Sequence, residues 1–234
     1  MYRGQDIGNR DKLIGRCLQA IGEKRSEALA QLLPHIAVIR AGELRDPLLQ
    51  LLETGSLRQK EVAAIALGSL GDPSVISPLC AALDSVESRR GRGYEAFMAA
   101  VIMALGEIGH GDAVPVLLQL YRSDQDRYLQ VQRRHLVMLS LGTLALHGSK
   151  RAEDELTALL ESGDDHERIS ALHELAGSYW SRPNEVPDPI IDQLAQLADQ
   201  SEDEDVSQAA LAALRSLAEI GCTKAEAYFR TQSV

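Results

Sequence analysis

Arginine and aromatic side chains gather in three segments of the sequence, and these residue types are the best suited to hold a partner. Arg, Tyr and Trp are over-represented where protein interfaces gain most of their binding energy. The chemistry that these segments support is recognition of another protein rather than the making or breaking of bonds. The predicted contact residues are Arg89, Arg90, Arg92, Tyr121, Arg122, Arg127, Tyr128, Arg134, Tyr179, Trp180 and Arg182.

Each of these segments also has a purely structural interpretation. The loop 88–93 is either a docking site for an acidic partner, a phosphate or RNA, or a solvated insert. The stretch 121–134 is either an interface or a charged helix surface with Tyr121 in the core. In the turn 178–184, Trp180 is either an exposed anchor or a ring that folds back between helices. The sequence leaves these alternatives open.

The titratable residues form no catalytic or metal-binding pattern. There is no nucleophile elbow, phosphate loop, dinucleotide fingerprint or His-Glu-x-x-His motif. His110 and His147 lie in similar turns but lack the carboxylates that would orient a ligating histidine. Cys17, Cys80 and Cys222 are far apart in the sequence, which favours small buried hydrophobes. We therefore predict no catalytic residue, no metal and no cofactor.

Composition narrows the class of protein. Acidic side chains number 34 against 24 basic ones, and this net charge of −10 argues against a nucleic-acid binder, which needs a cationic surface. The chain is 45% hydrophobic but only 4% aromatic, which favours packed helices over sandwiches or barrels. Asp6 and Asp11 interrupt any secretory signal, and the most apolar run, Leu136–Leu146, is shorter than the roughly 20 residues of a membrane span. We therefore expect a cytoplasmic protein.

A short glycine-containing motif recurs along the chain and organises it. The sequence Ala-Leu-Gly-x-(Leu/Ile)-Gly occurs twice, with Gly68 matched to Gly106. A third copy places Gly142 in the same register, and two degenerate copies place Ala176 and Ala218 there, at intervals of 34 to 42 residues. Because only Gly or Ala occupies this register position, we expect two helices to approach closely there.

Between these copies, apolar residues recur at spacings of 3 and 4, as in amphipathic helices. Asp72-Pro73 and Asp188-Pro189 mark helix starts, with Asp as N-cap and Pro at the first helical position. Each pair of helices can bury its apolar faces only against its neighbours, so we predict one solenoid domain over 1–234. The predicted helices are 10–21, then the pairs 25–40 with 43–53, 57–70 with 73–84, 94–108 with 112–122, 128–146 with 150–161, 165–179 with 187–199, and 204–220 with 223–231.

At these residues the chain resembles HEAT-like repeats, especially the short bacterial form named for phycobilisome lyases. The typical unit reads Ala-Ala-x-Ala-Leu-Gly-x-Ile-Gly-Asp-x-x-Ala-Val-Pro-x-Leu, and the segments 65–83 and 104–118 follow it. The resemblance is clearest over 40–122, and the repeats of 123–234 are degenerate. It implies an all-α, right-handed α-solenoid of about six helix pairs with an N-terminal capping helix. Such repeats serve many binding tasks, so the resemblance does not fix an activity.

Three activities found among similar proteins can be compared with these residues. Deoxyhypusine hydroxylase holds two irons with several His-Glu pairs, one per repeat, but at the matching register of these repeats the sequence has such a pair only at His173-Glu174. HEAT-like DNA glycosylases need a cationic cleft with aromatic residues, which the charge and the single Trp disfavour. The leading prediction is a non-catalytic scaffold or adaptor that binds another protein on the surface of its second helices. The alternative is a bilin lyase or chromophore-handling chaperone subunit.

Charge is distributed unevenly along the chain. Residues 1–60 hold ten basic and seven acidic side chains, whereas 181–234 hold four basic and ten acidic ones. In a solenoid a gradient in sequence becomes a gradient in space, so homo- or hetero-association through polarised ends is also predicted. The acidic run 202–205 either contributes to that surface or complements the positive end of the helix that follows.

Overall fold

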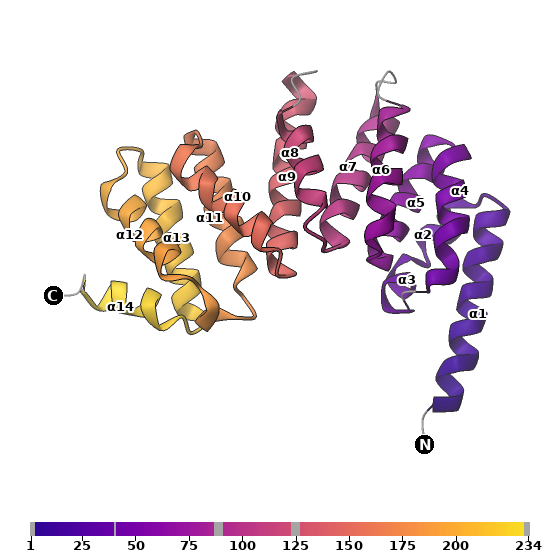
Figure 1. The fold of residues 1–234 in the computed structure, drawn as a ribbon, viewed down its shortest axis with the longest axis horizontal. Coiled ribbons are helices and arrows are strands. Elements are labelled where there is room, and N and C mark those ends of the chain that lie inside the picture. The colour runs from indigo at the N-terminus through magenta and orange to yellow at the C-terminus, as the bar shows by residue number, and fades with distance from the viewer. Residues whose placement is uncertain (1–2, 40, 87–90, 123–126, 232–234) are drawn as a thin grey trace. The chain divides into compact units, whose positions relative to one another are not determined.

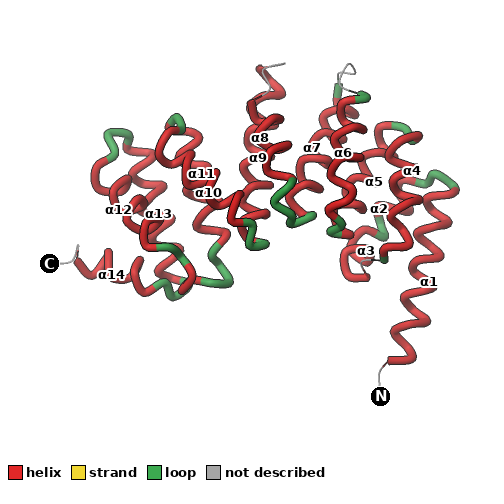
Figure 2. The backbone as a smooth tube through the Cα atoms, in the orientation of Figure 1, coloured by secondary structure: helices red, strands yellow, loops and turns green. Residues whose placement is uncertain are grey.

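The computed structural model describes residues 3–39, 41–86, 91–122 and 127–231, and every regular element in these ranges is a helix (Figures 1 and 2). Contacts between Cα atoms divide the chain into two compact units, Met1–Val137 and Met138–Val234. The division falls within one long helix, α9. The two units are described separately below, and the single domain over 1–234 stays a prediction.

The N-terminal unit is built from helices that pack on their near neighbours in sequence. Helix α5 packs against α4 and α7, and α6 packs against α4 and α7 as well. The first helices of neighbouring pairs, α5 and α7, therefore stack on each other, as do the second helices, α4 and α6. Its elements are α1 (Arg3–Gly22), α2 (Ser26–Ala30), α3 (Leu33–Ile39), η1 (Gly42–Leu44), α4 (Arg45–Thr54), α5 (Leu57–Leu70), η2 (Pro73–Val75), α6 (Ile76–Asp84), α7 (Arg92–Glu107), α8 (Ala113–Arg122) and the first part of α9 (Arg127–Leu146).

The C-terminal unit repeats this arrangement. Helix α11 packs against α10 and α13, and α12 packs against α13 and α14. Its elements are the rest of α9, α10 (Lys150–Ser162), α11 (Asp165–Ser178), η3 (Pro183–Glu185), α12 (Asp188–Gln200), α13 (Glu204–Glu219) and α14 (Thr223–Thr231). The predicted all-α solenoid of HEAT-like helix pairs is therefore confirmed.

Several helix ends differ from the predicted ones by one to three residues, and three differences have a clear structural reason or consequence. The helix predicted over 25–40 is two helices, because the ring of Pro34 and its missing amide hydrogen disfavour a continuous helix through the residues before it. Helix α1 begins at Arg3 rather than at residue 10, ahead of the first apolar periodicity. Helix α12 begins at Asp188 itself, so this aspartate is not the N-cap, whereas the Asp72 side chain does accept a hydrogen bond from the Ser74 amide at 2.9 Å.

The close helix approach predicted for the glycine register is present in both units. A Cβ added to Gly68 would lie 2.7 Å from the Cα atom of Ala104, which belongs to the neighbouring helix α7. A Cβ added to Gly142 would lie 2.9 Å from the carboxyl carbon of Glu174. Ala104 and Glu174 occupy equivalent places, each two residues before the register position of its own repeat. The same contact is thus made by a methyl group in one unit and by a carboxylate in the other.

Candidate partner-binding surface

Trp180 lies at the tip of the turn that joins α11 to α12, and its side chain is 70% exposed. The amide of Trp180 donates to the Gly177 carbonyl at 3.2 Å, and the amide of Arg182 donates to the Tyr179 carbonyl at 2.9 Å. These two backbone bonds close the turn around the indole-bearing residue. The indole is therefore exposed rather than folded back between helices, and its role as an anchor stays a prediction.

Arg182 holds this turn in place. Its Nη2 donates to the Ala145 carbonyl in the last turn of α9 at 2.6 Å, and this carbonyl also accepts from the Gly148 amide at 2.9 Å. Its guanidinium also lies 5.0 Å from the centre of the Tyr179 ring, and an ion pair to Glu185 spans 3.7 Å. The bond to Ala145 brings the turn beside the end of α9, where the Leu146 side chain is 43% exposed. The exposed indole is therefore carried by a turn whose base is fixed to α9.

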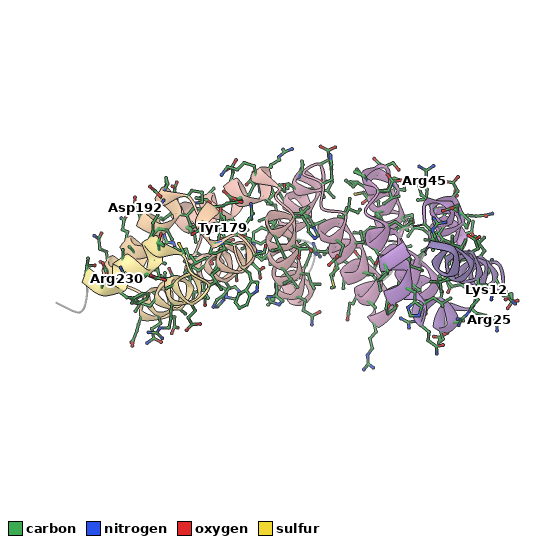
Figure 3. The ribbon with its side chains drawn as sticks, turned by 90° about the horizontal axis from the view of Figure 1, so that it is seen from below. Lys12, Arg25, Arg45, Tyr179, Asp192 and Arg230 are labelled. Carbon is green, nitrogen blue, oxygen red and sulfur yellow. The ribbon has the colours of Figure 1, made fainter. Side chains whose placement is uncertain are left out.

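Tyr179 does not reach the surface. Only 1% of the residue is exposed, and Figure 3 shows its ring among the helices of the C-terminal unit. Burial raises the pKa of Tyr179, and the Glu153 carboxylate near its hydroxyl acts in the same direction. The prediction of Tyr179 as a surface contact is thus wrong, because the ring fills the core beneath Arg182. The guanidinium of Arg182, in turn, is bound within the fold, to the Ala145 carbonyl and to Glu185.

The predicted segment 121–134 also contains a buried tyrosine next to an arginine. Tyr121 is 9% exposed, and the guanidinium carbon of Arg134 lies 5.1 Å from the centre of its ring. Tyr121 is thus a core residue, as the structural interpretation had it, and its prediction as a surface contact is wrong. Arg122 is exposed at the end of α8. The side chains of Arg127 and Tyr128 lie outside the described residues.

The arginine loop is described only at its end. Arg92 is exposed in the first turn of α7, directly after Gly91, whose φ of 117° is a backbone conformation that favours glycine. Arg89 and Arg90 lie outside the described residues. Arg92, Arg122 and Trp180 are therefore the predicted contact residues whose described side chains are both exposed and free of a structural role.

The second helices carry a groove in each unit. In the N-terminal unit, α4 and α6 line a groove of about 700 Å³ that includes Leu49, Pro78 and the buried Lys60. The Lys60 ammonium donates to the carbonyls of Leu52 and Glu53 and so satisfies acceptors at the end of α4. In the C-terminal unit, α10 and α12 line a groove of about 940 Å³. Both grooves lie on the second-helix surface that the sequence suggested for binding.

The titratable side chains do not converge on a reactive centre in the described part of the chain. No group of three His, Cys, Asp or Glu residues there is placed to hold a metal ion. His173 is exposed, while the neighbouring Glu174 carboxyl packs against Gly142, where burial raises its pKa to about 7. Burial also raises the pKa of the Cys17 and Cys80 thiols. Among the helices described, none is long and apolar enough to cross a membrane.

Sequence reasoning missed two parts of this surface. Asp192 and Glu202 line the α10–α12 groove, but Asp192 is not among the predicted contacts and Glu202 is predicted only as part of the acidic run 202–205. The signal for both is the excess of acidic residues in 181–234, from which the sequence predicts a polarised end but no groove. The interpretation of the run 202–205 as a helix start holds for Asp203, whose side chain accepts a hydrogen bond from the Val206 amide at 2.9 Å.

Comparison with known proteins agrees with this architecture. Residues 60–85 and 99–123 match the family model described as PBS lyase HEAT-like repeat. The first match begins in α5 and ends after α6, and the second begins in α7 and ends after α8. No curated protein matches the chain. Two segments of the chain are thus similar to the repeat of this family, and the same helix pairing recurs in both units.

Proposed function

We propose that the protein is a non-catalytic scaffold or adaptor of the cytoplasm, which binds another protein on its solenoid surface. The observation that carries the proposal is Trp180, a rigid and mostly exposed indole on a turn that Arg182 fixes to α9. Tryptophan is among the residues most enriched where protein interfaces gain binding energy, and this chain, with only 4% aromatic residues, places its one Trp on an exposed turn.

An anchor of this kind suits recognition. Tryptophan buries about 150–250 Å² when it enters a pocket of a partner, with little loss of side-chain entropy. Because the backbone of its turn is already hydrogen-bonded, binding does not have to order the segment.

Trp180→Ala is expected to weaken binding to the partner by about tenfold or more, as for other interface hot spots. The wild-type chain is used as bait in a native lysate, the captured protein is purified, and its Kd is measured for each variant by calorimetry. Val38→Ala is the matched control, since Val38 is 83% exposed on α3 of the other unit, and it should bind within twofold of wild type. Capture of no protein, or equal binding by Trp180→Ala, would count against the proposal.

A second candidate function is a bilin lyase or chromophore-handling chaperone subunit. The observation in its favour is the match of residues 60–85 and 99–123 to PBS lyase HEAT-like repeats. Co-expression with a bilin and an acceptor protein tests it, because attachment shifts the visible absorbance of the acceptor. A chain that binds no tetrapyrrole and leaves the absorbance unchanged is not such a subunit.

A further inference from the structure

The groove between the second helices of the C-terminal unit is strongly acidic. It is formed by α10 and α12, together with the start of α11 and the turn before α13, and its volume is about 940 Å³. Its charged lining residues are Glu161, Asp165, Asp192, Glu202, Asp203 and one cation, Arg168. Figure 3 shows Asp192 at the margin of the unit, away from the buried Tyr179.

Two of these carboxylates already have partners within the fold. Asp165 pairs with Arg168 at 3.2 Å, and Asp203 caps α13. Among the described residues, no ion pair joins Glu161, Asp192 or Glu202 to a basic side chain, and all three are exposed. The groove therefore presents three uncompensated negative charges to whatever enters it.

These charges are spread along the groove rather than gathered at one point. Asp192 lies in the first turns of α12 and Glu202 just beyond its end, ten residues later, which corresponds to about 15 Å along a helix. No trio of carboxylates in the described part of the unit is placed to hold a metal ion. An elongated cation, with charges several ångströms apart, fits this distribution better than a single divalent ion does.

The remaining lining suits a polypeptide. Helix α12 has 13 residues and is about 20 Å long, the length of roughly six residues of extended chain. Gln193, Gln196 and Gln200 follow the groove, and their amides can both donate to and accept from a peptide backbone. The half-buried Leu197 also lines it and offers apolar surface to the methylene stems of Lys or Arg.

We propose that this groove docks an extended, lysine- or arginine-rich segment of a partner protein. The proposal rests on the proposed scaffold function and specifies the chemistry of the partner. Nucleic acids and anionic membranes carry the wrong charge for this surface.

A second copy of this chain is the less suitable occupant. Its excess of basic side chains lies in 1–60, but several of these already pair with its own carboxylates. The pairs are Arg10–Glu43, Arg25–Glu23, Arg45–Asp72 and Arg58–Glu61. A second copy would have to give up these pairs to supply cations to the groove, whereas a flexible basic segment of another protein would not.

The experiment uses the full chain and a fluorescein-labelled peptide of about ten residues that alternates lysine and serine, long enough to span α12. Fluorescence anisotropy should show binding that weakens as salt is raised, and no binding of the same peptide with glutamate in place of lysine. The double variant Asp192→Asn with Glu202→Gln should lose about tenfold in affinity for the lysine peptide.

The control is Asp11→Asn with Glu219→Gln, which removes the same charge from exposed sites outside the groove and should stay within twofold of wild type. Circular dichroism should show equal helix content and melting for all three proteins. Absence of binding, or an equal loss in both double variants, overturns the proposal. Salt-dependent self-association in sedimentation without peptide binding overturns it in favour of a second copy. The peptide assay involves no native partner, so its failure leaves Trp180-dependent capture, and hence the scaffold function, untouched.

Discussion

Replacing Gly68 with alanine is expected to lower the free energy of unfolding of the N-terminal unit by about 2 kcal/mol or more. The added Cβ would lie 2.7 Å from Ala104 Cα and 2.8 Å from Ala104 Cβ. These atoms belong to or directly join the backbone of α7, so no side-chain rotation relieves the contact and α5 must move away from α7. The measurement is urea denaturation followed by circular dichroism at 222 nm.

Gly15→Ala is the matched control for this variant. Gly15 also lies inside a helix of the N-terminal unit, but a Cβ added there meets nothing within 4 Å. Its replacement should raise the free energy of unfolding by about 0.5–1 kcal/mol, because alanine has the higher helix propensity. The two substitutions must change the free energy of unfolding in opposite directions. A Gly68→Ala protein as stable as Gly15→Ala would show that the register glycine has no packing role.

The elements of the fold were predictable from the sequence because their signals are local. Ser56 and Gln59 form a capping box at the start of α5, and Asp164 and Glu167 form another at the start of α11, so helix starts are encoded within four residues. The register of Gly68 and Gly142 was also visible, since a position restricted to Gly or Ala needs only alignment of the repeats. Even the break before Pro34 has a local cause.

The binding surface was only partly predictable because its geometry depends on contacts between residues far apart in the chain. Tyr179, Trp180 and Arg182 lie in one turn and look equivalent in sequence, yet one is buried, one exposed and one bound to Ala145, 37 residues away. Similarly, Asp192 and Glu202 line one groove only because α10 and α12 stack. Residue type identified the segments, but the packing decided which side chains are available.

The periodicity of apolar residues also does not predict that the Glu174 carboxyl is buried against Gly142, and this burial should make stability depend on pH. The stability of the C-terminal unit is expected to fall as pH rises from about 4.5 to about 7, and to level off above that. Burial raises the pKa of Glu174 from 4.5 to about 7, so between these values the folded chain keeps a proton that the unfolded chain has lost. Raising the pH therefore favours unfolding. Allowing for the partial exposure of the carboxyl, the loss should be about 2 kcal/mol.

Glu174→Ala gives this repeat the side chain that Ala104 provides in the N-terminal unit, and Glu174→Gln keeps the size but removes the charge. Both variants should flatten the fall in stability between pH 4.5 and pH 7, and Glu174→Ala should be about 2 kcal/mol more stable than wild type at pH 8. Thermal and urea unfolding across this pH range provide the measurement. Glu219→Gln, at an exposed position of α13, should leave the slope unchanged. If Glu174→Gln and Glu219→Gln give the same pH profile, the carboxyl against Gly142 is not the group responsible, and the close helix approach tolerates its charge.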